Sequence, residues 1–93
     1  MAELRFSRRA LRSLQEQDDY LRPLNPTAAT AVLQEIERSC ALLAELPLLG
    51  RAIAGMALRH LVTPHYHYRV IYRLEGNELR VLDILHPRQD ARR

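Results

Sequence analysis

The chain has 93 residues, a formal net charge of +3, and hydrophobic residues at 47% of its positions. This length fits one domain covering residues 1–93, and the hydrophobic content suffices for a core, which excludes wholesale disorder. No apolar run is long enough to span a bilayer, no secretory signal is recognisable, and Cys40 has no second cysteine to pair with. A cytoplasmic protein without a membrane partner is therefore expected.

All 14 basic residues are arginine. Arginine binds phosphate and carboxylate groups through paired N–H donors, but it does not lose its proton in proteins. A mildly basic chain of this kind suits a nucleic acid or an acidic protein as partner. Genomic base composition can produce the same bias. In either case, a general base would have to be His, Asp, Glu or Tyr.

The chain begins with a predicted strand and helix. The stretch ELRF at 3–6 alternates apolar and charged residues, which is typical of a short strand. Ser7 is a suitable N-cap for a helix that ends near Arg22, before Pro23. The apolar stripe of this helix is predicted to consist of Leu11, Leu14 and Leu21.

A second helix is predicted from Asn25, the N-cap, with Pro26 at its first position, to about Glu45. Because the connection is short, the two helices should form an antiparallel hairpin. The buried face of the second helix is predicted to comprise Ala29, Val32, Ile36, Cys40 and Leu43. Cys40 is thus interpreted as a small core residue.

The second half of the chain is predicted to be β-structure. Strands are expected near 56–62, at 66–74 and at 78–86, and Gly76-Asn77 is a typical two-residue hairpin turn. The resulting class is α+β: an N-terminal strand, a two-helix antiparallel hairpin, and a three-stranded antiparallel meander with the helices packed on one face.

The hairpin turn predicts the cross-strand register. On the helix-facing side, the predicted register pairs Leu74 with Leu79, Tyr72 with Val81, Val70 with Asp83, and Tyr68 with Leu85. Asp83 is the one charge on that side, and Arg8, Arg9 or Arg12 could neutralise it.

The other side of the hairpin mixes apolar residues with cations. Its predicted pairs are Arg73 with Arg80, Ile71 with Leu82, Arg69 with Ile84, and His67 with His86. Two opposed arginines are unfavourable unless they are solvated or bind an anion. This side is therefore either a solvated face, which is common in antiparallel sheets, or a working surface.

Several segments together resemble the RelE/ParE superfamily of bacterial type II toxin–antitoxin toxins. They are LPLLGR at 46–51, LR at 58–59, YRVIY at 68–72 and VLDILHPRQD at 81–90, within the order strand, helix, helix, strand, strand, strand. The resemblance implies a toxin held inactive by a co-expressed antitoxin. It also implies either ribosome-dependent mRNA cleavage, as in RelE-like members, or inhibition of DNA gyrase, as in ParE-like members, which are not known as nucleases.

The resemblance also suggests site residues. Arg69 matches the arginine that holds the scissile phosphate in RelE-like nucleases, Arg88 matches a further arginine, and Arg59 lies near their basic strand. The chain departs from the nucleases in three ways: it has no lysine at 56–62, no terminal tyrosine in its DARR ending, and Pro87 after the late histidine. The ParE-like side is favoured.

Candidate chemistry centres on His86 and, less directly, His67. The two histidines could form an acid–base pair, with Arg69 or Arg88 as the cation for the phosphate. The alternative interpretation is that His86 only caps the strand end before Pro87. The tyrosines Tyr66, Tyr68 and Tyr72 are predicted to belong to the core.

No cofactor is expected, and HYH at 65–67 offers two histidines without a third metal ligand. Three functions remain open: a gyrase-directed toxin, a ribosome-dependent endoribonuclease, and a degenerate toxin that only binds its antitoxin. A neighbouring gene for a small ribbon-helix-helix protein would support the hypothesis of a toxin–antitoxin operon.

Overall fold

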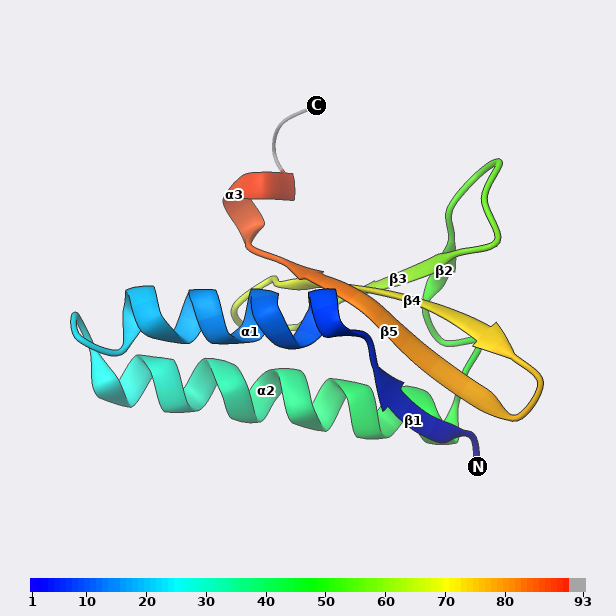
Figure 1. The fold of residues 1–93 in the computed structure, drawn as a ribbon, viewed down its shortest axis with the longest axis horizontal. Helices are drawn as coiled ribbons and strands as arrows, with labels where there is room; N and C mark the ends of the chain where they lie inside the picture. Colours follow the sequence, from blue (N-terminus) through cyan, green and yellow to red (C-terminus); the bar gives the residue numbers. More distant parts are fainter. Residues whose placement is uncertain (91–93) are drawn as a thin grey trace.

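The fold was analysed in a computed structural model that describes residues 1–90. Its elements, in chain order, are β1 (Glu3–Phe6), α1 (Arg8–Leu21), α2 (Pro26–Glu45), β2 (Arg51–Ala52), β3 (Arg59–Val62), β4 (Arg69–Glu75), β5 (Glu78–Leu85) and α3 (Pro87–Asp90). The predicted α+β class is confirmed. Figure 1 shows α1 and α2 running side by side against the sheet.

The sheet has five strands in the order β1-β5-β4-β3-β2. β1 lies parallel to β5, and every other neighbouring pair is antiparallel. β1 therefore lies next to β5, and the chain between them contains α1, α2 and the other three strands. The sequence did not predict the parallel pairing of β1 with β5.

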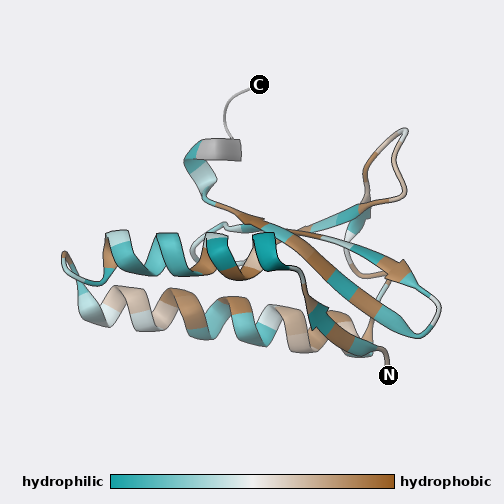
Figure 2. Cartoon of the chain, viewed as in Figure 1, coloured by the Kyte–Doolittle hydropathy of each residue, from teal (hydrophilic) through white to brown (hydrophobic). Residues whose placement is uncertain are grey.

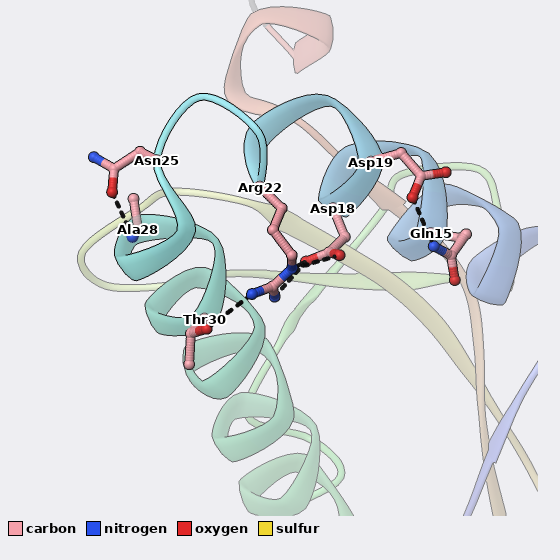
Figure 3. Close-up of polar contacts among 7 residues, drawn as sticks. All are labelled: Gln15, Asp18, Asp19, Arg22, Asn25, Ala28 and Thr30. Atoms are coloured by element: carbon pink, nitrogen blue, oxygen red, sulfur yellow. Dashed lines mark hydrogen bonds and ion pairs between the residues drawn. The ribbon is translucent and has the colours of Figure 1, made fainter.

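Local signals set the ends of both long helices. The Ser7 hydroxyl accepts a hydrogen bond from the Ala10 N–H, and the Asn25 side chain accepts one from the Ala28 N–H. At the C-terminal end of α1, Arg22 donates three hydrogen bonds to the Asp18 carboxylate and one to the Thr30 hydroxyl of α2 (Figure 3). These contacts fix the turn between the helices.

The core lies between the helical hairpin and one face of the sheet. The predicted face of α2 is confirmed, since its five residues are all buried: Ala29, Val32, Ile36, Cys40 and Leu43. From the sheet, the core receives Val70 and Tyr72 of β4 and Leu79, Val81 and Ile84 of β5. Figure 2 shows the corresponding brown bands along α2 and the central strands.

The predicted stripe on α1 is partly wrong. Leu11 is 54% exposed, whereas Ala10 is fully buried and packs in the core beside Leu14 and Leu21. The buried stripe therefore includes Ala10 and not Leu11. The prediction chose Leu11 because it is the more hydrophobic of the two neighbouring residues.

The predicted hairpin register holds from Gly76-Asn77 to the pair of Tyr72 with Val81 and then fails. Leu82 is an extra residue in β5, so that Ile71 lies opposite Asp83, and Val70 lies opposite Ile84. Ile84 therefore enters the core instead of Asp83. Arg9 does contact Asp83, at 3.3 Å between Nε and Oδ2, so the predicted helix partner of this carboxylate is confirmed.

The strand ends also differ from the prediction. β3 begins at Arg59, because residues 54–57 form a turn, and β4 begins at Arg69, because 63–68 forms a tight turn in place of extended chain. Tyr66 lies in this turn and is 39% exposed, so its predicted place in the core is wrong. The short elements β2 and α3 were not predicted. Within residues 1–90, no helix combines the length and apolar content that a bilayer span requires.

Candidate functional site

Three of the predicted site residues gather at one end of the sheet. Arg69 begins β4 opposite Leu85, the last residue of β5, and His86 and Arg88 follow directly. We call this region, with Tyr68, the β4–β5 corner. His86 and Arg88 line one hollow with Tyr68, whereas alternation along β4 turns Arg69 to the face opposite the buried Val70.

His86 has a defined structural role at this corner. Its Nδ1 accepts a hydrogen bond from the Arg88 N–H at 2.9 Å, and its ring meets Tyr68 edge-on, with centroids 5.4 Å apart. Burial, and then the positive charge of Arg88, lower the pKa of His86 below its usual 6.5. The ring is therefore neutral at physiological pH and caps the start of α3, which supports the capping interpretation.

The other half of the corner comes from α1 and was missed by sequence reasoning. Glu16 and Tyr20 line an open hollow together with Tyr68, His86 and Arg88. Gln17, from the same helix face, donates a hydrogen bond to the carbonyl oxygen of Ile84 at 2.9 Å. The i, i+4 spacing of Glu16 and Tyr20 was visible in the sequence, but the placement of α1 over the end of β5 was not.

A buried carboxylate holds the turn that precedes Arg69. Glu35 of α2 is 4% exposed and accepts hydrogen bonds from the N–H groups of His65 and Tyr66, at 3.1 and 2.8 Å, and from His65 Nδ1 at 2.8 Å. Burial acts to raise the pKa of Glu35, but these bonds and one from the Thr63 hydroxyl outweigh it and lower the pKa to about 2. Glu35 thus ties α2 to the entry of β4.

His67 does not pair with His86. It lies in the turn with φ of 59°, in the left-handed region, and is exposed. The predicted pair required an extended chain from residue 66. Hydrogen bonds between Thr63 and Tyr68 instead close a turn that contains His67. The acid–base pair of two histidines is therefore wrong.

Arg59 is separated from the β4–β5 corner. It pairs across the sheet with Tyr72, so both side chains project to the helix-facing side. Arg59 Nη1 donates to the Gly50 carbonyl oxygen at 2.7 Å, while the Tyr72 hydroxyl accepts from the Gly50 N–H at 3.0 Å and donates to the Pro47 carbonyl oxygen at 2.7 Å. This candidate residue secures the 47–50 loop.

The opposed arginines Arg73 and Arg80 are neutralised within the chain. Glu75 lies 3.0 Å from Arg73 and 3.6 Å from Arg80, and Glu78 lies 2.8 Å from Arg80. Arg5 of β1 continues the row, with contacts to Glu78 and Glu3. This part of the sheet is a row of alternating charges, which agrees with the solvated-face interpretation.

A second surface feature is apolar. A groove between α2 and β3 is lined by Leu42, Leu49, Leu61, Val62 and Pro64, among others. Leu42, Leu49 and Val62 are each at least 40% exposed, and Leu46 and Leu48 beside them are more exposed still. We call this surface the α2–β3 groove. Clustered exposed leucines of this kind are typical of a protein–protein contact.

The chemistry available at the β4–β5 corner is mainly anion binding. Arg88 supplies donors for a phosphate or carboxylate, Glu16 and His86 line the same hollow, and Arg69 lies at the start of β4 opposite Leu85. In the part of the chain that the structure describes, no group of three His, Cys, Asp or Glu side chains could hold a metal ion.

Comparison with known proteins gives a consistent result. Residues 4–91 match the model of a family described as the ParE toxin of the type II toxin–antitoxin system parDE. A curated Sinorhizobium fredii protein named "Putative toxin Y4kP" is 33% identical over 86 residues, which cover 92% of this chain and 88% of that protein.

Two solved structures share the fold. The chromosomal ParDE toxin–antitoxin system from P. aeruginosa has a chain that superposes with a TM-score of 0.80 at 24% identity. The intact E. coli RelBE toxin–antitoxin complex has one with a TM-score of 0.67 at 16% identity. In both comparisons the match covers 92% of this chain and 96% of the other.

Proposed function

Because this chain belongs to the ParE toxin family of type II toxin–antitoxin systems, we propose that it inhibits DNA gyrase and is neutralised by a co-expressed antitoxin in the bacterial cytoplasm. The toxin acts by contact and not by catalysis. The observation that carries this proposal is the hydrogen bond from the Arg88 N–H to His86 Nδ1. Because of this bond, Nδ1 of the histidine at the β4–β5 corner caps α3.

The protonation of His86 supports the same conclusion. A general acid for mRNA cleavage must carry a proton at neutral pH, but burial and Arg88 lower the pKa of His86. Arg69 and Arg88 cannot exchange protons, so their role is to hold anionic groups. A corner rich in arginine and poor in proton donors suits contact with gyrase or its bound DNA.

One observation favours a second candidate, ribosome-dependent cleavage of mRNA. Glu16 lines the same hollow as His86 and Arg88, so a carboxylate base is available beside the candidate histidine. A nuclease of this type would use Glu16 or His86 for proton transfer and Arg88 for the phosphate.

Two assays on the purified toxin separate these functions. Supercoiling and cleavage-complex assays measure gyrase inhibition, and toeprinting measures cleavage on programmed ribosomes. We expect gyrase inhibition that is lost in Arg88→Ala and retained in His86→Ala, without ribosomal cuts. Codon-dependent cuts that disappear in Glu16→Gln or His86→Ala would instead assign the nuclease. Inactivity in both assays, with antitoxin binding intact, would identify a degenerate toxin.

The antitoxin is proposed to bind the α2–β3 groove. An amphipathic segment that folds on binding would place its apolar residues over Leu42, Leu49 and Val62. Co-expression with the neighbouring gene product should yield one complex in size-exclusion chromatography. Separate elution at micromolar concentration would contradict this part of the proposal.

A further inference from the structure

The first turns of α1 carry three exposed arginines, Arg8, Arg9 and Arg12, which we call the α1 arginine surface. Arg9 lies 3.3 Å from Asp83, but its side chain remains 79% exposed. Within residues 1–90, the side chains of Arg8 and Arg12 form no hydrogen bond or ion pair. Figure 2 shows this end of α1 as strongly hydrophilic.

This arrangement opposes the local preferences of a helix. The N-terminal end of a helix carries partial positive charge and favours acidic residues, yet the first turn of α1 has none. Arg8 and Arg12 also stand at i, i+4, where like charges repel each other. Arg22 shows the contrasting case, because it lies at the C-terminal end and is paired with Asp18 (Figure 3). A cluster that weakens its own helix points to a binding role.

The surroundings of the cluster are polar. The three arginines line a hollow with Ser13, Glu16, Asp83 and Leu85, so that Leu85 is its one apolar side chain. Asp83 is already engaged, since it accepts hydrogen bonds from the Ser13 hydroxyl at 2.6 Å and the Ile84 N–H at 2.8 Å and contacts Arg9. Its charge therefore offsets mainly Arg9 and leaves Arg8 and Arg12 available.

We propose that the α1 arginine surface binds the phosphodiester backbone of a nucleic acid. Nucleic-acid interfaces are more polar and much more positively charged than protein–protein interfaces. The chain keeps these two surface types apart: the α2–β3 groove suits a polypeptide, and the α1 arginine surface suits a polyanion. The inference goes beyond the proposed function, because it applies whether the target is gyrase or the ribosome.

The test is the salt dependence of binding, measured by fluorescence anisotropy with the full-length protein. The probes are a 20-base-pair duplex of arbitrary sequence and the corresponding single strand. Each phosphate contact contributes about 0.9 to the slope of log K against log salt for a duplex and about 0.7 for a single strand. Arg8→Gln with Arg12→Gln should therefore lower the duplex slope by about 1.8 and weaken binding at least about tenfold at low salt.

Three controls keep the test decisive. Arg38→Gln with Arg51→Gln removes the same charge elsewhere and should leave the slope within about 0.5 of wild type. Arg8→Lys with Arg12→Lys keeps the charge and should retain the slope. The Arg8→Gln, Arg12→Gln variant should melt at the same or a higher temperature than wild type, since it relieves the repulsion at the helix start.

Three outcomes would overturn the inference. The first is an unchanged slope in the folded Arg8→Gln, Arg12→Gln variant. The second is an equal loss of slope in the Arg38→Gln, Arg51→Gln control. The third is a polyglutamate peptide that binds wild type as tightly as the oligonucleotides and loses affinity in the Arg8→Gln, Arg12→Gln variant. That result would assign the surface to an acidic polypeptide.

Discussion

Gly50 lies directly against the ring of Tyr72. A Cβ atom added at Gly50 would lie 2.5 Å from Tyr72 Oη and 2.7 Å from the His60 carbonyl oxygen. Tyr72 is fully buried, and its hydroxyl bridges Gly50 and Pro47, so the ring has little room to move. The glycine of LPLLGR is thus required by close packing and not by backbone conformation.

We predict that Gly50→Ala destabilises the fold by about 1–3 kcal/mol, as overpacking of a buried site does. Urea unfolding measures this loss. In a Tyr72→Phe background the loss should be smaller, because the nearest clashing atom is absent. A loss below about 0.5 kcal/mol for Gly50→Ala alone would mean that the 47–50 loop is not held as described.

Glu35 makes stability depend on acid pH. Its pKa is lowered from 4.5 to about 2, so the ionised carboxylate stabilises the folded state fully above pH 4.5. This contribution declines as the pH falls from 4.5 to about 2. Glu35→Gln should therefore lower the unfolding free energy by on the order of 3 kcal/mol at neutral pH and by much less near pH 2.5.

Urea titrations of both proteins between pH 7 and pH 2.5 measure this convergence. Glu37→Gln, an exposed change on the same helix, is the matched control and should give a small, constant difference. A difference for Glu35→Gln that stays constant with pH would show that the pKa of this carboxyl group is not lowered by folding.

At the scale of elements, α2 contributes most of the helical part of the core. Ile36 is 2% exposed and packs toward the sheet, so Ile36→Ala should cost about 2–5 kcal/mol of unfolding free energy. Leu42→Ala, on the same helix at a position that is 44% exposed, should cost less than about 1 kcal/mol. Similar losses for the two variants in urea unfolding would contradict the assigned helix face.

The elements that the sequence predicts well are those with local signals. The caps Ser7 and Asn25 and the turn at Gly76-Asn77 each act within a few residues, and all three appear as predicted. The bulge at Leu82 has no such signal, because it depends on β1 and α1: the Ser7 hydroxyl bonds to the Leu82 carbonyl oxygen and Ser13 bonds to Asp83.

The candidate site shows the same division. The hairpin turn predicts that the start of β4 lies near the end of β5, but the bulge at Leu82 places Arg69 opposite Leu85 instead of Ile84. The shift of Arg59 to the helix-facing side and the arrival of Glu16 from α1 depend on contacts between residues far apart in the sequence. The hairpin register describes only β4 and β5, so it cannot predict the positions of Arg59 and Glu16.

At the scale of the whole molecule, the α2–β3 groove and the β4–β5 corner draw on different elements. The groove is lined mainly by α2, the loop after it, β3 and the start of the 63–68 turn, whereas the corner is lined by α1, Tyr68 at the end of that turn, His86 and α3. Antitoxin binding and target inhibition should therefore respond to different substitutions. If both partners used one surface, substitutions there would remove both properties together.

Antitoxin binding and toxicity should be separable by substitutions on the two surfaces. Leu42→Ser with Leu49→Ser should weaken antitoxin binding at least about tenfold and leave the free toxin toxic, because both leucines are exposed and the core is unchanged. Arg69→Ala with Arg88→Ala should abolish toxicity while the protein still elutes with its antitoxin. Growth assays with and without antitoxin, combined with size-exclusion chromatography and melting curves, measure both properties. A correctly folded variant of either pair that loses both properties would contradict the assignment of two surfaces.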